Sequence, residues 1–346
     1  MSDPTPAAAS RRSTGKIQVA RAVWYAKPGV VELRAETLKA PTLDEARVRT
    51  QFSGISRGTE RLILSGAVAP SEWARMRAPL QGGNFPFPVK YGYCATGVVE
   101  IGPKDLVGKT VFCLHPHQDV FNAPISMLVP VPGHVPARRA TLAAHVETAL
   151  NALWDAAAGP ADKIVVVGAG VIGLLVGALA ARMPGADVTI VDVDAGRRAI
   201  VEAVGAKFAL APGAPDQLPG PSIEDCDIAF HTSVTQAGLN TAIGCVGNEG
   251  TIIELSWYGE KPVTIDLGGP FHSKRLKLIS SQVGQVSPSR RPRWTYRRRL
   301  EAALNLLDDP RLDALVADEI KFDDCASALP ALLDGRTTGL APVIRY

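Results

Sequence analysis

The stretch Lys163-Ile-Val-Val-Val-Gly-Ala-Gly-Val-Ile-Gly173 decides the fold of this chain. It begins with a short apolar run rich in β-branched residues, Ile164–Val167, which is typical of a buried strand. The segment from Gly168 to Gly173 follows directly and opens a helical pattern. A second strand-like run, Val188–Val191, then ends in Asp192. This order of strand, glycine turn, helix and acid-tipped strand predicts a βαβ unit that binds a dinucleotide.

The glycines and the helix start each have a physical role in such a unit. Gly168 permits the tight turn, and Gly170 lets the backbone approach a pyrophosphate. Gly173 lets the helix pack closely against the strand. The free N–H groups of the first turn, at Val171 and Ile172, and the positive end of the helix dipole favour a bound phosphate. The alternative interpretation is a tightly packed strand–helix turn without a ligand.

The acid at the tip of the second strand predicts which dinucleotide binds. Asp192 would accept hydrogen bonds from the adenosine ribose hydroxyls, and its charge would repel a 2′-phosphate. The sequence therefore predicts NAD(H), with NADP(H) still possible. Arg197 and Arg198 follow closely and either soften this preference or are solvent-exposed residues of the next helix.

Composition limits the class of protein. The chain has 346 residues, enough for two domains, of which 46% are hydrophobic and 21% charged. A net charge of +3 is too small to indicate binding to nucleic acid or a membrane surface. The five scattered cysteines contain no Cys-x-x-Cys pair, which favours a reducing compartment. The first 16 residues lack the apolar core of a signal peptide and are predicted to be a disordered tail. We therefore expect a soluble, cytoplasmic protein that acts on a small molecule.

The chain changes character near Arg138. Before it, from about Ile17, short strand-like runs alternate with Gly and Pro, which predicts a barrel-like, mainly antiparallel β domain. After it, strand-like and helix-like runs alternate, which predicts a doubly wound parallel sheet. The predicted fold class is thus α/β and β, with residues 17–146 and 284–346 in a β domain and 147–283 in a Rossmann coenzyme domain. Expected strands are 18–25, 45–53, 95–101, 110–114, 164–167, 187–193, 228–231, 250–255 and 277–281, and expected helices are 139–158, 170–183, 195–204, 296–308 and 323–333.

A β-rich first domain followed by this fingerprint resembles the medium-chain dehydrogenase/reductase superfamily. The resemblance covers nearly the whole chain after Ile17 and includes the segments Gly54–Glu60, Tyr91–Gly102, Glu147–Leu153 and Val246–Leu255. Within the superfamily, Gly-Ile-Ser-x-Gly-Thr-Glu is similar to the bacteriochlorophyllide a dehydrogenase branch. The resemblance implies a GroES-like β domain, a Rossmann domain, hydride transfer in the cleft between them, and a homodimer or homotetramer.

Zinc-dependent members of that superfamily carry three zinc ligands whose positions resemble Ser56, Tyr93-Cys94 and about Ala144 in this sequence. Catalytic zinc needs three protein ligands, and serine with alanine cannot supply that set. The sequence therefore predicts no catalytic zinc. One alternative metal set remains open, formed by His115, His117 and Asp119 with Cys94 and His145.

Without zinc, a hydroxyl or an imidazole must stabilise or protonate the reacting oxygen. Tyr93 takes the position that resembles a zinc-binding histidine and is predicted to be the proton donor; the alternative is an ordinary core aromatic. Ser56 and Thr59 are predicted to orient or relay the proton, or else belong to a simple turn beside Gly58. His117 and His145 are further candidate acids, because histidine can charge near neutral pH.

The resemblance also implies cofactor contacts outside the glycine turn. Thr148 matches a threonine near the nicotinamide ring, and Ser233, Leu255 and Ser256 match residues near the ribose and carboxamide. Arg57 matches a residue beside the pyrophosphate.

A basic stretch, Arg290–Arg299, carries Trp294 and Tyr296 between its arginines. One short cluster in a nearly neutral chain gives a weak electrostatic signal for nucleic acid. A solvated helix start is one interpretation, and recognition of a substrate carboxylate or phosphate is another.

The sequence as a whole predicts an NAD(H)-dependent oxidoreductase that interconverts a secondary alcohol and a ketone without zinc. Two alternatives remain: an NAD(P)H-dependent reductase of quinones or enones, and a nucleotide-sensing protein without turnover.

Overall fold

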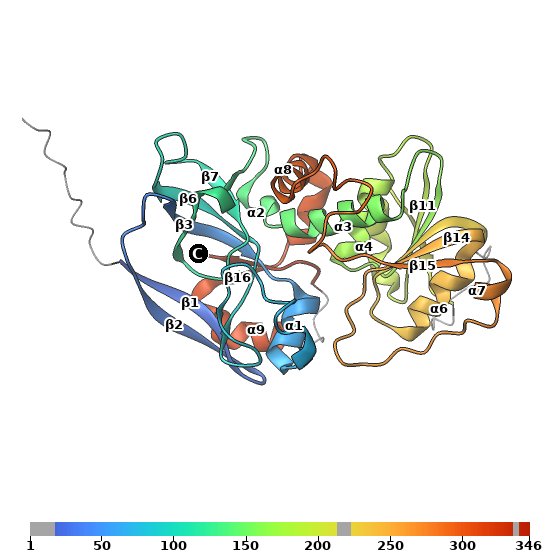
Figure 1. The fold of residues 1–346 in the computed structure, drawn as a ribbon, viewed down its shortest axis with the longest axis horizontal. Coiled ribbons are helices and arrows are strands. Elements are labelled where there is room, and N and C mark those ends of the chain that lie inside the picture. Colours follow the sequence, from blue (N-terminus) through green and yellow to red (C-terminus); the bar gives the residue numbers. More distant parts are fainter. Residues whose placement is uncertain (1–17, 213–222, 335–338) are drawn as a thin grey trace, which may run out of the picture.

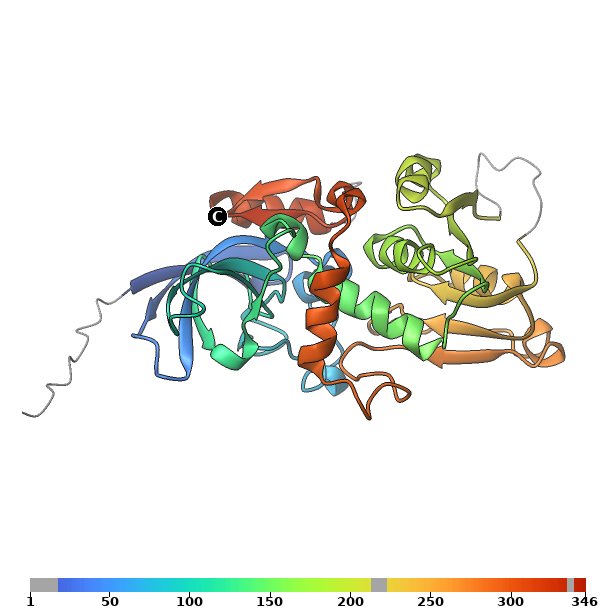
Figure 2. The same cartoon turned by 90° about the horizontal axis from the view of Figure 1, so that it is seen from above.

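The computed structural model describes residues 18–212, 223–334 and 339–346 (Figure 1). The tail predicted for residues 1–16 lies outside the described residues. Two lobes lie side by side in both views, and α3 (Ala143–Asp155) and α8 (Tyr296–Leu306) run between them (Figures 1 and 2). Helix α3 packs against α8 and against α4 (Val171–Ala180), so one helix touches both lobes.

The second lobe contains a parallel sheet with β10 (Lys163–Val167) near its centre. Among the described residues its strand order is β12-β11-β10-β13-β14-β15, and every neighbouring pair is parallel. This order is that of a doubly wound dinucleotide-binding sheet, which confirms the prediction. Its other elements are β11 (Asp187–Asp192), α5 (Arg198–Ala203), β12 (Lys207–Leu210), β13 (Cys226–His231), α6 (Gln236–Cys245), β14 (Val246–Glu254), α7 (Pro270–Ser273) and β15 (Lys277–Ser280).

The first lobe is built from two mainly antiparallel sheets, of order β2-β1-β5-β4 and β16-β17-β3-β6-β7-β9, with β8 paired to β3. The last strands of the chain join the strands of its beginning, because β17 pairs with β3. The elements of this lobe are β1 (Gln18–Lys27), β2 (Val30–Leu38), β3 (Glu45–Gly54), α1 (Arg57–Ser65), β4 (Gly82–Gly83), β5 (Val89–Lys90), β6 (Ala95–Ile101), β7 (Thr110–Cys113), β8 (Val120–Pro124), β9 (Val129–Pro130), α2 (Ala137–Ala140), β16 (Glu319–Lys321), α9 (Cys325–Leu333) and β17 (Val343–Arg345).

Two expectations need correction. No helix was predicted over Arg57–Ser65, where a simple turn beside Gly58 was the alternative role of Ser56 and Thr59, but this segment is helix α1. The predicted helix over 139–158 is two helices, because Thr141 and Leu142 separate α2 from α3. In the part of the chain that is described, no helix has the length and apolar character needed to cross a membrane.

Candidate active site

The glycine turn has the geometry that dinucleotide binding requires. Gly168 has φ +109°, in the left-handed region that favours glycine. A Cβ at Gly173 would lie 1.9 Å from the carbonyl oxygen of Gly168, so only glycine allows this close approach of helix and strand. A Cβ at Gly170 would meet no atom within 4 Å, which leaves open space beside that backbone. Helix α4 starts there without a side-chain cap, so the N–H groups around Val171 and Ile172 are available to a ligand.

Asp192 lies directly beside this turn. One carboxylate oxygen accepts the Ala169 N–H at 2.5 Å, and the other accepts the Asp194 N–H at 2.9 Å. The side chain stays half-buried at the carboxyl end of β11. The structure therefore brings the predicted glycines and the predicted acid to the same edge of the sheet.

Arg57, from the other lobe, lies within electrostatic reach of this edge. Burial, and then the charges of Arg61 and Arg197, lower the pKa of Arg57. Its guanidinium donates to the carbonyl oxygen of Gly339. Arg197 pairs with Asp194 at 3.3 Å, whereas Arg198 stacks over Phe208 and pairs with Glu202. Two cationic groups from different lobes thus come near each other, which is a favourable arrangement for an anion between them.

Tyr93, Ser56 and Thr59 form one hydroxyl cluster. The hydroxyls of Ser56 and Thr59 lie close enough to the Tyr93 phenol to affect its pKa. Burial and the nearby Cys94 thiol raise the pKa of this phenol, and the two neighbouring hydroxyls partly oppose that effect. Tyr93 therefore keeps its proton at neutral pH and can donate it. The first turn of α1 holds Thr59, and Ser56 immediately precedes that helix.

His117 lies beneath this cluster and has no free nitrogen. It is fully buried, its Nε2 lies 3.1 Å from a carboxylate oxygen of Glu60, and its Nδ1 lies 2.7 Å from Ser53 Oγ. Glu60 also accepts the Tyr25 hydroxyl at 2.6 Å and the Ser56 N–H at 2.7 Å. The prediction that His117 is a substrate acid needs correction, because both of its nitrogens are used to hold Glu60 and Ser53.

Helix α3 brings two further predicted residues to this region. Thr148 is half-buried, and its hydroxyl donates to the Ala144 carbonyl at 3.1 Å. The His145 ring centroid lies 6.4 Å from that of Tyr93. Tyr93 packs at the edges of two hydrophobic clusters, one in the β lobe and one that extends through α3 into the Rossmann lobe.

Ser233, Leu255 and Ser256 lie at the carboxyl ends of β13 and β14. Ser233 Oγ is 2.8 Å from Nε2 of His231, and Ser256 Oγ accepts the Val234 N–H at 3.1 Å. Leu255 packs against the cluster that Tyr93 also touches. These contacts place the predicted residues together on the coenzyme side.

Sequence reasoning missed the hydrogen-bonded pair of His231 and Glu254 at this edge. His231 Nδ1 lies 2.8 Å from a Glu254 carboxylate oxygen, and the Tyr258 hydroxyl donates to the same carboxylate at 3.2 Å. The pKa of Glu254 is lowered, since the hydrogen bond and charge of His231 outweigh the opposing effect of burial, which is the largest single contribution. A signal was available, because His231 ends β13 and Glu254 ends β14, and the carboxyl ends of parallel neighbours meet.

The Rossmann lobe contacts the β lobe in the segment that follows β14. Trp257 packs against the core cluster of the β lobe. A Cβ at Gly259 would lie 3.1 Å from the Ala67 carbonyl oxygen and from Leu62 Cδ2, so the backbone there touches the end of α1. The carboxyl edge of the parallel sheet and the helix that follows Ser56 are therefore neighbours.

The alternative metal set does not come together. His115 stacks on Phe121 with ring centroids 3.7 Å apart, and its Nδ1 lies 2.8 Å from the Pro116 carbonyl oxygen, whereas both nitrogens of His117 contact Ser53 and Glu60. Within residues 18–212, 223–334 and 339–346, no group of three or more His, Cys, Asp or Glu side chains is placed to hold a metal ion.

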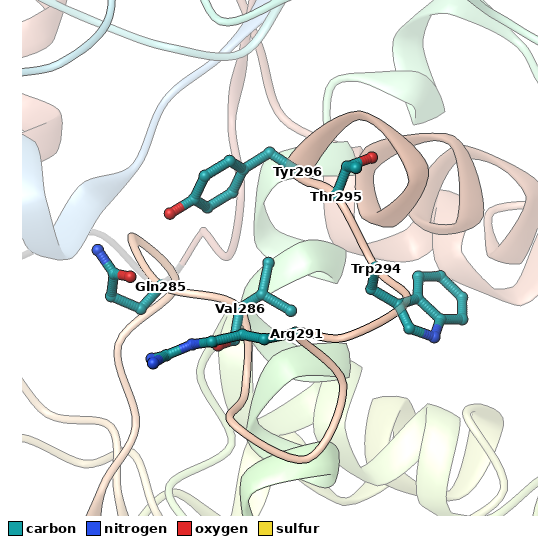
Figure 3. A pocket seen from close by; sticks show the side chains of 6 residues that line it. All are labelled: Gln285, Val286, Arg291, Trp294, Thr295 and Tyr296. Carbon is teal, nitrogen blue, oxygen red and sulfur yellow. The ribbon is translucent and has the colours of Figure 1, made fainter.

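Several arginines of the basic stretch contact other residues of this chain. Arg299 is buried and pairs with Glu147 at 3.0 Å, which joins α8 to α3. Arg298 lies over Trp294, and Arg290 lies over Trp154. A surface hollow of about 290 Å³ lies beside the start of α8 (Figure 3). It is lined by Gln285, Val286, Arg291, Trp294, Thr295 and Tyr296. Arg299 is thus a structural residue rather than a solvated one. The remaining arginines of the stretch are exposed, as a solvated helix start requires: Arg290, Arg291, Arg293, Arg297 and Arg298.

Known dehydrogenases resemble this chain, distantly in sequence and closely in fold. No family model matches the chain. It is 25% identical over 224 residues to an uncharacterized zinc-type alcohol dehydrogenase-like protein of Haemophilus influenzae, and the match spans 63% of this chain but only 61% of that protein.

Solved structures match over nearly the full length. L-idonate 5-dehydrogenase of Escherichia coli superposes with a TM-score of 0.78 at 14% identity, covering 96% of this chain and 99% of that one. A short chain alcohol dehydrogenase of E. coli CFT073, complexed with NADH, gives 0.74 at 15% identity, covering 95% and 99%. The chain therefore shares the two-domain fold of these dehydrogenases, in which a mainly antiparallel β domain is joined to a parallel dinucleotide-binding sheet.

Proposed function

We propose that this chain is an NAD(H)-dependent oxidoreductase that interconverts a secondary alcohol and a ketone without catalytic zinc. The observation that carries the proposal is the cluster of hydroxyl groups that Tyr93, Ser56 and Thr59 bring together. It stands at the positions that resemble the zinc ligands of zinc-dependent relatives, beside a glycine turn suited to a dinucleotide.

The residues at the carboxyl edge of the parallel sheet fit a nicotinamide dinucleotide. Gly168, Gly170 and the first turn of α4 would hold the pyrophosphate, with Arg57 adding a positive charge from the opposite lobe. Asp192 would hold the adenosine ribose and disfavour a 2′-phosphate. When bound, the nicotinamide supplies or accepts the hydride.

The hydroxyl cluster provides the proton. A phenol is neutral at pH 7, and burial, which raises the pKa of Tyr93 further, keeps it so, which leaves its O–H able to donate a hydrogen bond to a ketone oxygen. Ser56 and Thr59 hold the phenol in place and can accept or return its proton. Ser56 is itself fixed through its N–H, which donates to the buried Glu60 carboxylate. Leu255 and Trp257, packed at the lobe boundary, help to exclude water.

The donor set does not fit zinc. Catalytic zinc is held by three thiolate, imidazole or carboxylate ligands. These positions carry a serine hydroxyl, the Tyr93 phenol or the neighbouring Cys94 thiol, both with a raised pKa, and an alanine, so they offer at most one such ligand. We therefore assign no step to a metal.

Replacement of Tyr93 by phenylalanine tests the proposal. Loss of a general acid lowers turnover by roughly 10²- to 10⁴-fold, and we expect Tyr93→Phe to do this while NADH binding, followed by fluorescence titration, stays nearly unchanged. Tyr296→Phe is the matched control, because that tyrosine is 54% exposed. Undiminished turnover in Tyr93→Phe would remove the phenol from the mechanism. Activity confined to enones or quinones would favour the reductase alternative. Binding without turnover of any alcohol, ketone, enone or quinone would favour a nucleotide sensor.

A further inference from the structure

His145 is a buried polar side chain without a partner. It is 4% exposed, and neither Nδ1 nor Nε2 makes a hydrogen bond with any of the described residues. The other buried histidines, His115, His117 and His231, each have at least one partner. An unpaired buried polar group costs stability, and a leucine in its place would not carry that cost. The position therefore indicates a ligand.

The location of His145 identifies which ligand it meets. Its ring lies beside Tyr93, with centroids 6.4 Å apart and planes tilted by 45°. The Tyr93 phenol already lies beside the hydroxyls of Ser56 and Thr59, which the proposed function assigns to the reacting oxygen. A group bound to His145 would thus sit next to the group bound to Tyr93, and a small substrate can present both.

The chemistry of the imidazole indicates which kind of substrate group can bind to His145. Burial lowers the pKa of His145 to about 4, so at pH 7 the ring is neutral, with one N–H donor and one acceptor nitrogen. A hydroxyl can pair with either nitrogen, since it both donates and accepts, whereas a carbonyl oxygen pairs only with the N–H. A ring that gives up its proton so readily is also a poor acid or base at neutral pH.

We propose that His145 binds a second hydroxyl of the substrate, on the carbon next to the reacting one, so that vicinal diols and α-hydroxy ketones are preferred over simple alcohols and ketones. This inference rests on the proposed oxidoreductase function. In the oxidation, the carbinol C–H leaves as hydride to NAD⁺. The O–H proton passes to the Tyr93 oxygen as that phenol gives its own proton to the Thr59 hydroxyl, and half-buried Thr59 in turn releases its proton to water. The carbon–oxygen single bond becomes a carbonyl, and the second hydroxyl is unchanged.

The test compares two substrates that differ only in the second hydroxyl, vicinal cyclohexanediol and cyclohexanol, with wild type and His145→Leu. One buried hydrogen bond corresponds to about a 10- to 100-fold difference, so the wild type should show a kcat/KM for the diol higher by that factor. In His145→Leu the ratio should fall to about one. His134→Leu is the control, since His134 is exposed and should leave the ratio unchanged.

The outcomes separate this inference from the function on which it rests. Equal kcat/KM values for the two alcohols in the wild type would overturn the inference alone. An equal loss for both substrates in His145→Leu would also overturn it, because His145 would then act on the reacting oxygen. Turnover of neither compound, nor of the matching ketones, would overturn the proposed function and this inference with it.

A second readout is independent of turnover. With ¹³C-labelled histidine, the ring signal that disappears in His145→Leu belongs to His145. Addition of the diol to the protein loaded with NADH should shift that signal, and addition of cyclohexanol should not. The thermal midpoint of His145→Leu should equal or exceed that of the wild type, whereas a lowered midpoint together with an unmoved signal would assign His145 a purely structural role, satisfied by water.

Discussion

Replacement of Glu60 by glutamine probes the support beneath the hydroxyl cluster. The carboxylate is fully buried and accepts the Tyr25 hydroxyl, the Ser56 N–H and a contact from His117 Nε2. In Glu60→Gln the amide oxygen can keep the Ser56 N–H, but the amide nitrogen then faces Tyr25 and His117. We expect the variant to fold with reduced stability and with a less ordered Ser56.

The magnitude follows from the bonds that are lost. A hydrogen bond to a charged group contributes about 1.5 to 3 kcal/mol, and one such bond, to Tyr25, is 2.6 Å long. The contact between Glu60 and His117 Nε2 is the second interaction that is lost, and partial rearrangement of the His117 ring offsets some of that loss. We therefore predict a decrease of about 2 to 4 kcal/mol in the free energy of unfolding. Glu32→Gln is the control, because Glu32 is exposed, and should change stability by less than about 0.5 kcal/mol.

Urea and thermal unfolding of Glu60→Gln, Tyr25→Phe and the double variant complete the experiment. The two residues share a bond, so the effects should be non-additive, with a coupling of about 1 to 2 kcal/mol. Additive effects, or a Glu60→Gln protein as stable as Glu32→Gln, would refute the reasoning that Glu60 anchors this region.

Three further predictions concern the cofactor, acid stability and assembly. Asp192→Ala should weaken NADH binding and reduce the preference for NADH over NADPH by about 10-fold in fluorescence titrations; unchanged preference would remove Asp192 from cofactor selection. Burial lowers the pKa of His115 to about 3 and of His145 to about 4, from 6.5. The folded state therefore takes up fewer protons than the unfolded chain, and the thermal midpoint should fall as the pH drops from about 6.5 towards 4. His115→Phe should flatten that decline, and a midpoint independent of pH would contradict this. The edge strand β15 exposes Leu278 and Ile279, so a homodimer formed through this edge should dissociate in Ile279→Lys, as measured by light scattering; a monomeric wild type would contradict the proposed dimer.

The coenzyme sheet was predictable because its signals are local. The apolar run at Ile164–Val167, the glycines after it and Asp192 all lie within one βαβ unit, and each constrains the backbone of its neighbours. The predicted strands agree with β10, β11 and β13 to within two residues at either end.

Helix α1 was missed because its first turn reads as a loop. Gly58 and Thr59 both have low helix propensity, and no side chain caps the N-terminus. Its stability comes from tertiary contacts instead, since Ile63 and Leu64 are buried and Glu60 is bonded to residues of other elements.

The role of His117 could not be predicted from spacing alone. Its partner Glu60 lies 57 positions earlier in the chain, and only the folding of the β lobe brings the two together. The cluster of Tyr93, Ser56 and Thr59 is equally non-local, and the resemblance to a known superfamily was needed to group those residues. The missing partner of His145 depends on packing from every side, which no sequence pattern records.

The central claim is that hydroxyl groups take the place of zinc in the reaction. The most direct test is the turnover of a secondary alcohol with NAD⁺ by protein dialysed against a strong chelator, with the zinc content of the same sample measured by mass spectrometry. We predict full activity at a zinc content far below one ion per chain. Activity that is lost on chelation and restored by added Zn²⁺ would contradict it.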